Sequence, residues 1–345
     1  MGWDNEIVKN PDFFGDDWAC ESIPQREEQI KRLFQCAEPL LRRKVPIHAW
    51  IHGKPGTGKT LVSRFFLKKL EEKHFIQGAY INCWECRTLY AVLERLVLDL
   101  RVLGADKPDA RFKLERLKRH LKDRPFVVVL DEIDMSPPKE RNNIVYNLMS
   151  LGCVGLVCIS YSRQTYYELD DRVKSRLNPH FIEFRPYSAD DITAILKDRA
   201  EAALLPESWN TEDLERIALL SKGDVRTAIQ TLKNAVYWAK SEGSSRLIYH
   251  HIQNGINKAR SLKKKYLLKK LTKDHRILYG LVKKRGEILS GELWNLYQKV
   301  CSEKELKPIA PRTYSMYINQ LIDLGLIEAE RAKIRGKVRI FRAVV

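Results

Sequence analysis

The stretch that decides the fold is a glycine-rich run of eight residues, Gly53-Lys54-Pro55-Gly56-Thr57-Gly58-Lys59-Thr60. It fits the spacing G-x-x-x-x-G-K-[ST] completely and stands between an apolar strand and a predicted helix. Glycines let backbone N–H groups turn inward around phosphate oxygens, and a helix N-terminus adds partial positive charge. The run therefore predicts a nucleoside triphosphate site with Mg²⁺. Its expected contact residues are Pro55, Gly56, Thr57, Gly58, Lys59, Thr60 and Leu61.

A pair of carboxylates follows the apolar run 126–130. Asp131 and Glu132 stand at the end of this predicted strand, where a phosphate site of this kind needs acidic groups. We expect Asp131 to hold Mg²⁺ through water together with the Thr60 hydroxyl, and Lys59 to reach the β- and γ-phosphates. Glu132 is placed to polarise the attacking water as general base. The two motifs together predict hydrolysis of the nucleotide.

Apolar runs alternate with helical patterns through the first half of the chain, which indicates a doubly wound α/β domain with a parallel sheet over residues 1–185. Strands are expected at residues 47–52, 79–82, 126–130, 154–160 and 181–184. Helices are expected at residues 25–42, 61–72, 89–103, 110–121 and 139–150.

The pattern changes twice after residue 185. Residues 186–261 predict a small all-helical lid domain, with Ser188 as a helix N-cap and Gly223 as a break between two helices. Residues 262–345 predict three helices and a β-hairpin, which is the winged-helix variant of helix-turn-helix.

Basic residues gather toward the C-terminus. The chain has 61 Lys and Arg against 44 Asp and Glu, a net charge of +17; residues 262–345 hold 20 and 8 of these, a net charge of +12. A basic segment at one end of a chain is typical of a protein that binds nucleic acid. No apolar run approaches the roughly 18 residues of a membrane helix. The seven cysteines, without an export signal, are expected to be free thiols.

The winged-helix segment offers two groups of DNA contacts. A recognition helix is expected at residues 311–324, and its first turn lies where base edges or phosphates are reachable. The candidates there are Arg312, Thr313 and Tyr314. The hairpin tip forms a wing whose cations would enter the minor groove or follow its phosphates. The candidates there are Arg331, Lys333, Arg335, Gly336, Lys337 and Arg339.

Two arginines complete the predicted phosphate site. Arg176 precedes the fifth strand, from where it could reach a neighbouring subunit's γ-phosphate as an arginine finger. Arg226 begins a helix of the lid, from where it could touch the γ-phosphate of its own subunit. A surface salt bridge is the alternative for Arg176, and an ordinary helical position is the alternative for Arg226.

These motifs, in their order along the chain, resemble the AAA+ ATPases. After the phosphate loop the matching runs are Leu130-Asp131-Glu132-Ile133-Asp134, Arg172-Val173-Lys174-Ser175-Arg176-Leu177 and Gly223-Asp224-Val225-Arg226. Ile23-Pro24-Gln25-Arg26-Glu27-Glu28-Gln29-Ile30 and Phe184-Arg185-Pro186-Tyr187 further resemble the archaeal replication initiators. These are related to eukaryotic origin recognition complex subunit one and to the cell-division-cycle loader protein. The resemblance runs from Trp18 to the end of the chain.

The resemblance implies a protein that uses ATP or ADP with Mg²⁺, binds duplex DNA at replication origins and helps load the minichromosome-maintenance helicase. It implies cytoplasmic, chromosome-associated action in an archaeal cell and no membrane partner, and it leaves contacts with other initiator subunits open. Carried over by position, the adenine pocket involves Ile23, Pro24, Arg26 and Tyr187. A DNA-touching helical element falls on residues 101–119, where the basic residues are Arg101, Lys107, Arg111, Lys113, Arg116, Lys118 and Arg119.

The chain departs from the family in two places. Tyr161 stands where the family usually has an asparagine as the polar sensor beside the attacking water, which predicts slow hydrolysis used as a switch. Residues 105–109 lack the glycine-containing tip expected of the helical element. Two alternatives stay open: a nucleotide-locked DNA-binding protein, such as a plasmid or viral initiator or a repressor, and a signalling switch whose winged helix contacts proteins.

Overall fold

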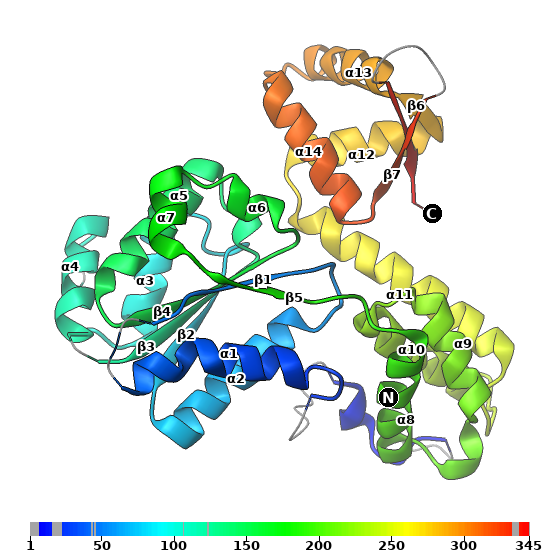
Figure 1. Ribbon diagram of the computed structural model, residues 1–345. Helices are drawn as coiled ribbons and strands as arrows, with labels where there is room; N and C mark the ends of the chain where they lie inside the picture. Colours follow the sequence, from blue (N-terminus) through cyan, green and yellow to red (C-terminus); the bar gives the residue numbers. More distant parts are fainter. Residues whose placement is uncertain are drawn as a thin grey trace. The chain divides into compact units, whose positions relative to one another are not determined.

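The computed structural model describes residues 7–15, 23–42, 44, 46–105, 107–122, 124–332 and 338–344 (Figure 1). The chain forms two compact units, Met1–Ile256 and Asn257–Val345. The division falls inside the long helix α11 (Tyr249–Lys270), as does the boundary expected after residue 261. The expected boundaries themselves stay predictions.

The described part of the first unit contains a five-stranded parallel sheet in the order β2-β3-β4-β1-β5. Its strands are β1 (Ala49–His52), β2 (Gln77–Asn82), β3 (Phe126–Asp131), β4 (Val154–Ser160) and β5 (His180–Glu183). Every residue of β3 and β4 is buried, as the unbroken apolar runs predict. The carboxyl ends of all five strands meet at one edge, so the residues that follow β1, β3 and β4 converge there.

Helices cover both faces of this sheet (Figure 1). Val127 and Val129 of β3 point into a core shared with α1 (Glu27–Leu41) and α2 (Lys59–His74). Their neighbours Val128 and Leu130 point into the opposite core. The helices of that second face are α3 (Leu89–Asp99), α4 (Ala110–His120), α5 (Pro138–Leu148), α6 (Gln164–Tyr167) and α7 (Asp171–Leu177).

The lid begins with α8 (Ala189–Ala203) and continues through α9 (Thr211–Ser221), α10 (Val225–Ser241) and the start of α11. Ser188 caps α8 in a reciprocal capping box with Asp191, as the sequence predicts. The N-terminal turn η1 (Pro11–Phe14) packs on this lid, where Phe14 is fully buried and Arg199 donates to the Phe13 carbonyl at 2.8 Å. Nothing in the sequence pattern predicts that docking.

The second unit is a winged helix, which confirms the predicted class. Its elements are α12 (Lys273–Arg285), β6 (Glu287–Leu289), α13 (Ser290–Glu303), α14 (Pro311–Asp323), β7 (Ile327–Arg331) and β8 (Arg339–Ala343). The antiparallel sheet has the order β6-β8-β7. Strand β6 was not predicted, because three residues are too few to show an alternating pattern.

Two further expectations hold over the described ranges. The cysteines described are all free thiols. No described helix combines the length and apolarity needed to span a membrane.

Candidate nucleotide and nucleic-acid sites

The glycine-rich loop joins β1 to α2 and leaves its backbone open. Gly56 and Gly58 have φ angles of 76° and 86°, a left-handed conformation that glycine adopts without steric cost. A Cβ atom on Gly56 would lie 2.0 Å from Oδ1 of Asp224, so the lid touches the loop here. The Val225 N–H of the lid donates to the Gly56 carbonyl at 3.2 Å. The phosphate loop and the lid are therefore joined directly.

Lys59 lies at the centre of the loop. Its ammonium donates to the carbonyls of Gly53 and Lys54 at 2.5 and 2.8 Å. Burial lowers the pKa of Lys59 to about 8, against the opposing effects of Asp131, Asp134 and Glu132. A cation beside the backbone groups of a glycine-rich loop suits a phosphate site. Arg226, in the first turn of α10, is exposed, and its contact with the γ-phosphate stays a prediction.

Thr60 and Asp131, the two residues expected to hold Mg²⁺, lie in contact. The Thr60 hydroxyl donates to Oδ2 of Asp131 at 2.6 Å, and Asp131 is 2% exposed. The Tyr80 hydroxyl donates to the same oxygen at 2.6 Å. A hydroxyl and a carboxylate at the edge of a phosphate loop are the hard oxygen ligands that suit Mg²⁺, so these residues fit the expected ion.

Tyr80 was missed by the sequence reading. It lies on β2, opposite Val129 of β3, two residues before Asp131 on that strand. Side chains two residues apart on a strand share a face, so Tyr80 and Asp131 lie on the same side of the sheet. A tyrosine on the strand next to β3, two positions before the level of Asp131, is the signal that could have identified Tyr80 as a partner of Asp131.

The residues after Asp131 form a tight turn. Glu132 has a φ of 55°, and the short helix η2 (Ile133–Met135) follows. Burial raises the pKa of Asp134 to about 6, against the favourable effects of Arg141 and of the Tyr161 backbone N–H. The carbonyl of Tyr161 accepts from the Gly53 N–H at 3.2 Å, so the residue that follows β4 lies beside the start of the phosphate loop.

The adenine-side element places Arg26 between three segments. Its guanidinium lies 3.8 Å from the ring centre of Tyr187. It donates to the carbonyls of Thr57 at 3.1 Å and Arg185 at 2.8 Å. Ile23 is buried beside it in the core of α1 and α2, and Pro24 is half-buried. Arg26 and Tyr187, two of the four residues expected in the adenine pocket, therefore meet beside Thr57 of the phosphate loop; the pocket itself stays a prediction.

Arg176 points away from the phosphate loop of its own subunit. It is exposed on α7, and its guanidinium donates to the Met149 carbonyl at 3.2 Å and lies over the ring of Tyr146. Met149 precedes β4, so it lies at the amino ends of the strands, the edge of the sheet opposite the phosphate loop. Arg176 therefore does not serve the phosphate loop of its own subunit, and its action on a neighbouring subunit stays a prediction beside the alternative of an ordinary surface position.

The helical element 101–119 divides its cations between the interior and the surface. Lys113 is 2% exposed and binds Glu94 at 2.6 Å, and Arg116 donates to the Gly104 carbonyl at 3.0 Å. The expected phosphate contact of Lys113 is wrong, because its buried ammonium binds Glu94 of α3. Arg116 is half-buried and bonds the turn before α4, and its phosphate contact stays a prediction. Arg111 is exposed. Lys107 lies 5.1 Å from the ring centre of Phe112.

The glycine missing from residues 105–109 is found one position earlier. Gly104 has a φ of 67° and turns the chain between α3 and α4. The turn of the helical element therefore does contain a glycine, at position 104.

The residues of the winged-helix unit that were expected to contact DNA differ in their exposure. Arg312 is exposed and Thr313 half-buried in the first turn of α14. Tyr314 is half-buried: its ring packs edge-on against Trp294 at 4.7 Å, and burial raises its pKa to about 12. Its contact with DNA stays a prediction. Lys333, Arg335, Gly336 and Lys337 lie outside the described residues.

The described base of the wing carries two cations side by side. Arg331 of β7 and Arg339 of β8 are direct cross-strand partners. Like charges opposite each other destabilise a sheet. Arg339 also donates to Asn319 of α14 at 3.0 Å, which ties the wing to the expected recognition helix.

Three family models match the chain: the AAA ATPase domain over residues 22–159, the Cdc6 AAA+ ATPase-type lid domain over 193–257, and the CDC6 C-terminal winged helix domain over 277–345. The ORC1-type DNA replication protein 1 of Sulfurisphaera tokodaii is 33% identical, over 96% of this chain and 88% of its own length. The chain belongs to the ORC1/Cdc6 family of DNA replication proteins. A second family member, the ORC1-type DNA replication protein of Pyrococcus abyssi, is 30% identical over 94% of this chain and 84% of its own length.

Solved structures of the ORC1/Cdc6 family share the whole fold. The Aeropyrum pernix ORC1 protein, solved in complex with DNA, is 26% identical with a TM-score of 0.76 over 98% of this chain and 94% of that one. Cdc6p of Pyrobaculum aerophilum has the same fold at 22% identity and a TM-score of 0.66, over 98% of this chain and 94% of its own. Membership confirms the resemblance drawn from the motifs and makes this chain an AAA+ ATPase at the level of the family.

Proposed function

We propose that the chain is an ATP-dependent replication initiator that binds duplex DNA at origins and helps load the replicative helicase, with slow ATP hydrolysis as the switch. The observation that carries this proposal is the bond between the Val225 N–H and the Gly56 carbonyl. Because the lid contacts the phosphate loop there, a bound nucleotide and the position of the lid depend on each other. Its archaeal relatives favour action at the chromosome of an archaeal cell.

The geometry supports a division of labour among the site residues. Lys59 and Arg226 would bind the β- and γ-phosphates, and Glu132 would accept a proton from the attacking water. Thr60 and Asp131 would hold Mg²⁺, which neutralises charge on the phosphates when it is bound. The stacking of Arg26 on Tyr187 and its bond to the Thr57 carbonyl support an adenine pocket of Ile23, Pro24, Arg26 and Tyr187 beside the loop. Arg176 would complete the site of a neighbouring subunit.

DNA binding is proposed for the winged-helix unit. The cross-strand pair Arg331 and Arg339 leaves two like charges together, and phosphate groups would relieve their repulsion. The relative solved in complex with DNA aligns with this chain over 98% of its length. With about six phosphate contacts, affinity should fall by about three orders of magnitude between low and physiological salt. Arg111 and Lys107 are proposed as further phosphate contacts.

Fluorescence anisotropy with duplex fragments of the source chromosome tests this proposal, in ATP, in ADP and without nucleotide. Replacing Arg331 and Arg339 together by alanine should weaken binding at least tenfold. Replacing Arg42 and Lys197, two exposed cations of the first unit, removes the same charge and should change affinity less than threefold. Equal losses in both double variants, or affinity independent of nucleotide, would contradict the proposal. Absence of DNA binding at moderate salt would favour the signalling switch.

Tyr161 favours one second candidate, a nucleotide-locked DNA-binding protein. Its phenol is longer than the asparagine side chain of the family and needs more space beside the attacking water. Phosphate release by the unaltered chain and by Glu132→Gln separates the two functions. A rate at least tenfold higher in the unaltered chain supports a hydrolytic switch, and equal rates support the lock.

A further inference from the structure

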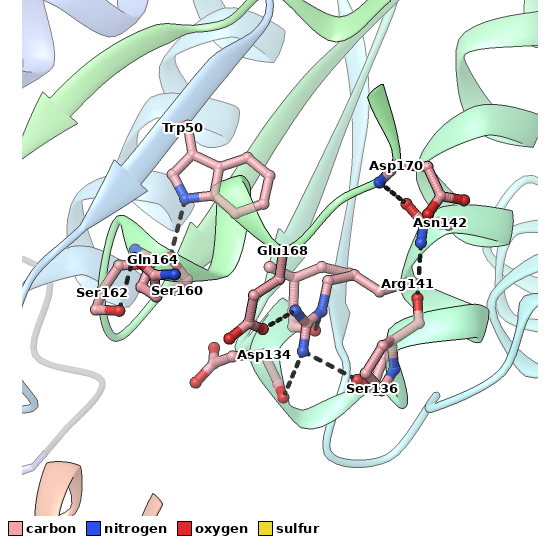
Figure 2. A network of polar contacts seen from close by, with 12 residues as sticks. Trp50, Asp134, Ser136, Arg141, Asn142, Ser160, Ser162, Gln164, Glu168 and Asp170 are labelled. Atoms are coloured by element: carbon pink, nitrogen blue, oxygen red, sulfur yellow. Dashed lines mark hydrogen bonds and ion pairs between the residues drawn. The ribbon is translucent and has the colours of Figure 1, made fainter. Parts of the chain in front are cut away.

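Arg141 lies at the centre of a buried polar network on the sheet face covered by α5 (Figure 2). Its side chain is 4% exposed although it carries a full charge. The guanidinium donates to the carbonyls of Ile133, Asp134 and Ser136 at 3.2 to 3.3 Å, and to the Glu168 carboxylate at 3.0 Å. A buried cation is strongly unfavourable once it loses its partners. Arg141 therefore fixes the position of residues 133–136 relative to Glu168.

The three carbonyls belong to the turn that carries Glu132. The left-handed φ of 55° at Glu132 is unfavourable for a residue with a side chain, and it persists only where the surroundings hold it. The carbonyl of Glu132 accepts from the Met135 N–H at 2.9 Å, which closes the turn. Arg141 bonds the carbonyls of the following residues from outside. The direction of the Glu132 side chain thus depends on this guanidinium.

The fourth acceptor belongs to the segment that leads into α7. Glu168 ends α6, and Asp170 is the N-cap of α7. The Asp170 N–H donates to Oδ1 of Asn142 at 2.9 Å (Figure 2). Arg141 and Asn142, adjacent on α5, therefore hold both ends of the short link between α6 and α7. Helix α7 carries Arg176, the residue proposed to reach the neighbouring subunit.

We infer that Arg141 is a positioning residue that couples the orientation of Glu132 to the position of α7 through Glu168. The carboxylate of Glu168 is 47% exposed, so it can exchange its buried partner for water or for a neighbouring subunit. A displacement of α7 would then loosen the guanidinium and release the turn that carries Glu132. This inference rests on the hydrolytic function proposed above. It adds a route by which a neighbouring subunit, through its contact with α7, sets the rate of hydrolysis at the Glu132 of this subunit.

Glu168→Gln in the full chain tests the coupling, because it removes the charge with little change in shape at a half-exposed site. The expected result is a fall of about tenfold in kcat for phosphate release, the size of a lost charged hydrogen bond. The Kd for ATP should stay within about twofold, since no phosphate contact changes. In a Glu132→Gln background the same substitution should have no further effect. Glu38→Gln, which breaks the exposed pair with Arg42, is the matched control and should leave kcat unchanged.

Amide hydrogen exchange gives a second readout that does not require turnover. Glu168→Gln should accelerate exchange by about threefold or more in both segments 133–136 and 171–177, and Glu38→Gln in neither. Arg141→Lys, which keeps the charge but loses the planar fork, should behave like Glu168→Gln. Unchanged exchange in either segment would overturn the inference, whatever the rate of hydrolysis. Absence of phosphate release by the unaltered chain would instead refute the proposed hydrolysis, and the exchange result would still decide whether the two segments are coupled.

Discussion

The Tyr80 hydroxyl donates a 2.6 Å hydrogen bond to Oδ2 of Asp131, the same oxygen that accepts from the Thr60 hydroxyl. The orientation of the Asp131 carboxylate is therefore fixed from two elements, β2 and α2. The guanidinium of Arg64 lies over the Tyr80 ring, 4.4 Å from its centre. Tyr80 thus supports the residues that fit Mg²⁺ without being one of them.

Tyr80→Phe should weaken the Mg²⁺-dependent part of ATP binding. It removes one hydrogen bond to a charged acceptor, worth about 1.5 kcal/mol or roughly tenfold in affinity. Titration calorimetry with ATP in Mg²⁺ and in EDTA measures the effect, and affinity in EDTA should not change. Tyr237→Phe removes an exposed hydroxyl of the lid and serves as the control. Equal losses with and without Mg²⁺ would show that Tyr80 acts only on the fold.

Gly56→Ala should disrupt the contact between the phosphate loop and the lid. The added Cβ would lie 2.0 Å from Oδ1 of Asp224, and the φ of 76° also disfavours alanine. Gly243→Ala introduces a Cβ at a similar φ of 67° with no atom within 4 Å. We expect the first substitution to lower the free energy of unfolding by about 1–3 kcal/mol more than the second. Urea unfolding measures this difference; equal losses would mean that Asp224 moves aside freely.

Arg26→Lys should destabilise the fold although it keeps the charge. Lysine cannot reproduce the fork that bonds Thr57 and Arg185 or the stacking on Tyr187. The expected loss is about 1–3 kcal/mol in the free energy of unfolding. Arg32→Lys, at an exposed pair with Glu28, should cost under about 0.5 kcal/mol. A similar small loss at both positions, measured by urea unfolding, would show that Arg26 joins nothing essential.

His48 should make the stability depend on pH on the acid side. Burial, and secondarily Arg176, lowers its pKa to about 4 in the folded chain, and its Nδ1 accepts from the Leu156 N–H at 3.1 Å. The pKa of His48 is 6.5 in the unfolded chain and about 4 in the folded chain, so between these two pH values the unfolded state binds more protons. Stability therefore falls as pH drops through this window.

His48→Asn keeps an acceptor for Leu156 and removes the titration. The unaltered chain should lose about 1–2 kcal/mol more stability than this variant between about pH 7 and pH 4.5, allowing for partial solvent screening. Urea unfolding at both pH values measures it. Parallel losses in the two proteins would assign the acid sensitivity to other groups.

The order of strands and helices along the chain was predictable because each element carries its own local signal. The apolar run before Asp131 and the glycines of the phosphate loop are read directly from the sequence. Contacts between helices are what such reading misses. The place of Tyr314 in the first turn of a recognition helix suggested a DNA contact, but only the packing of α13 against α14 shows that its ring also contacts Trp294. Lys113 was wrongly grouped with the phosphate contacts, since its partner Glu94 lies on another helix.

By itself, the sequence predicted a phosphate-binding loop at residues 53–60 and determined the α/β class of the first unit and the basic winged helix. Glycine conformations, strand burial and charge act over a few neighbouring residues, so a linear pattern reveals them. Only the tertiary structure decided which residues from distant segments meet: Tyr80 with Asp131, Asp224 with Gly56, and Arg141 with Glu168. These contacts depend on how strands and helices pack in three dimensions, and no local pattern along the chain encodes the pairing.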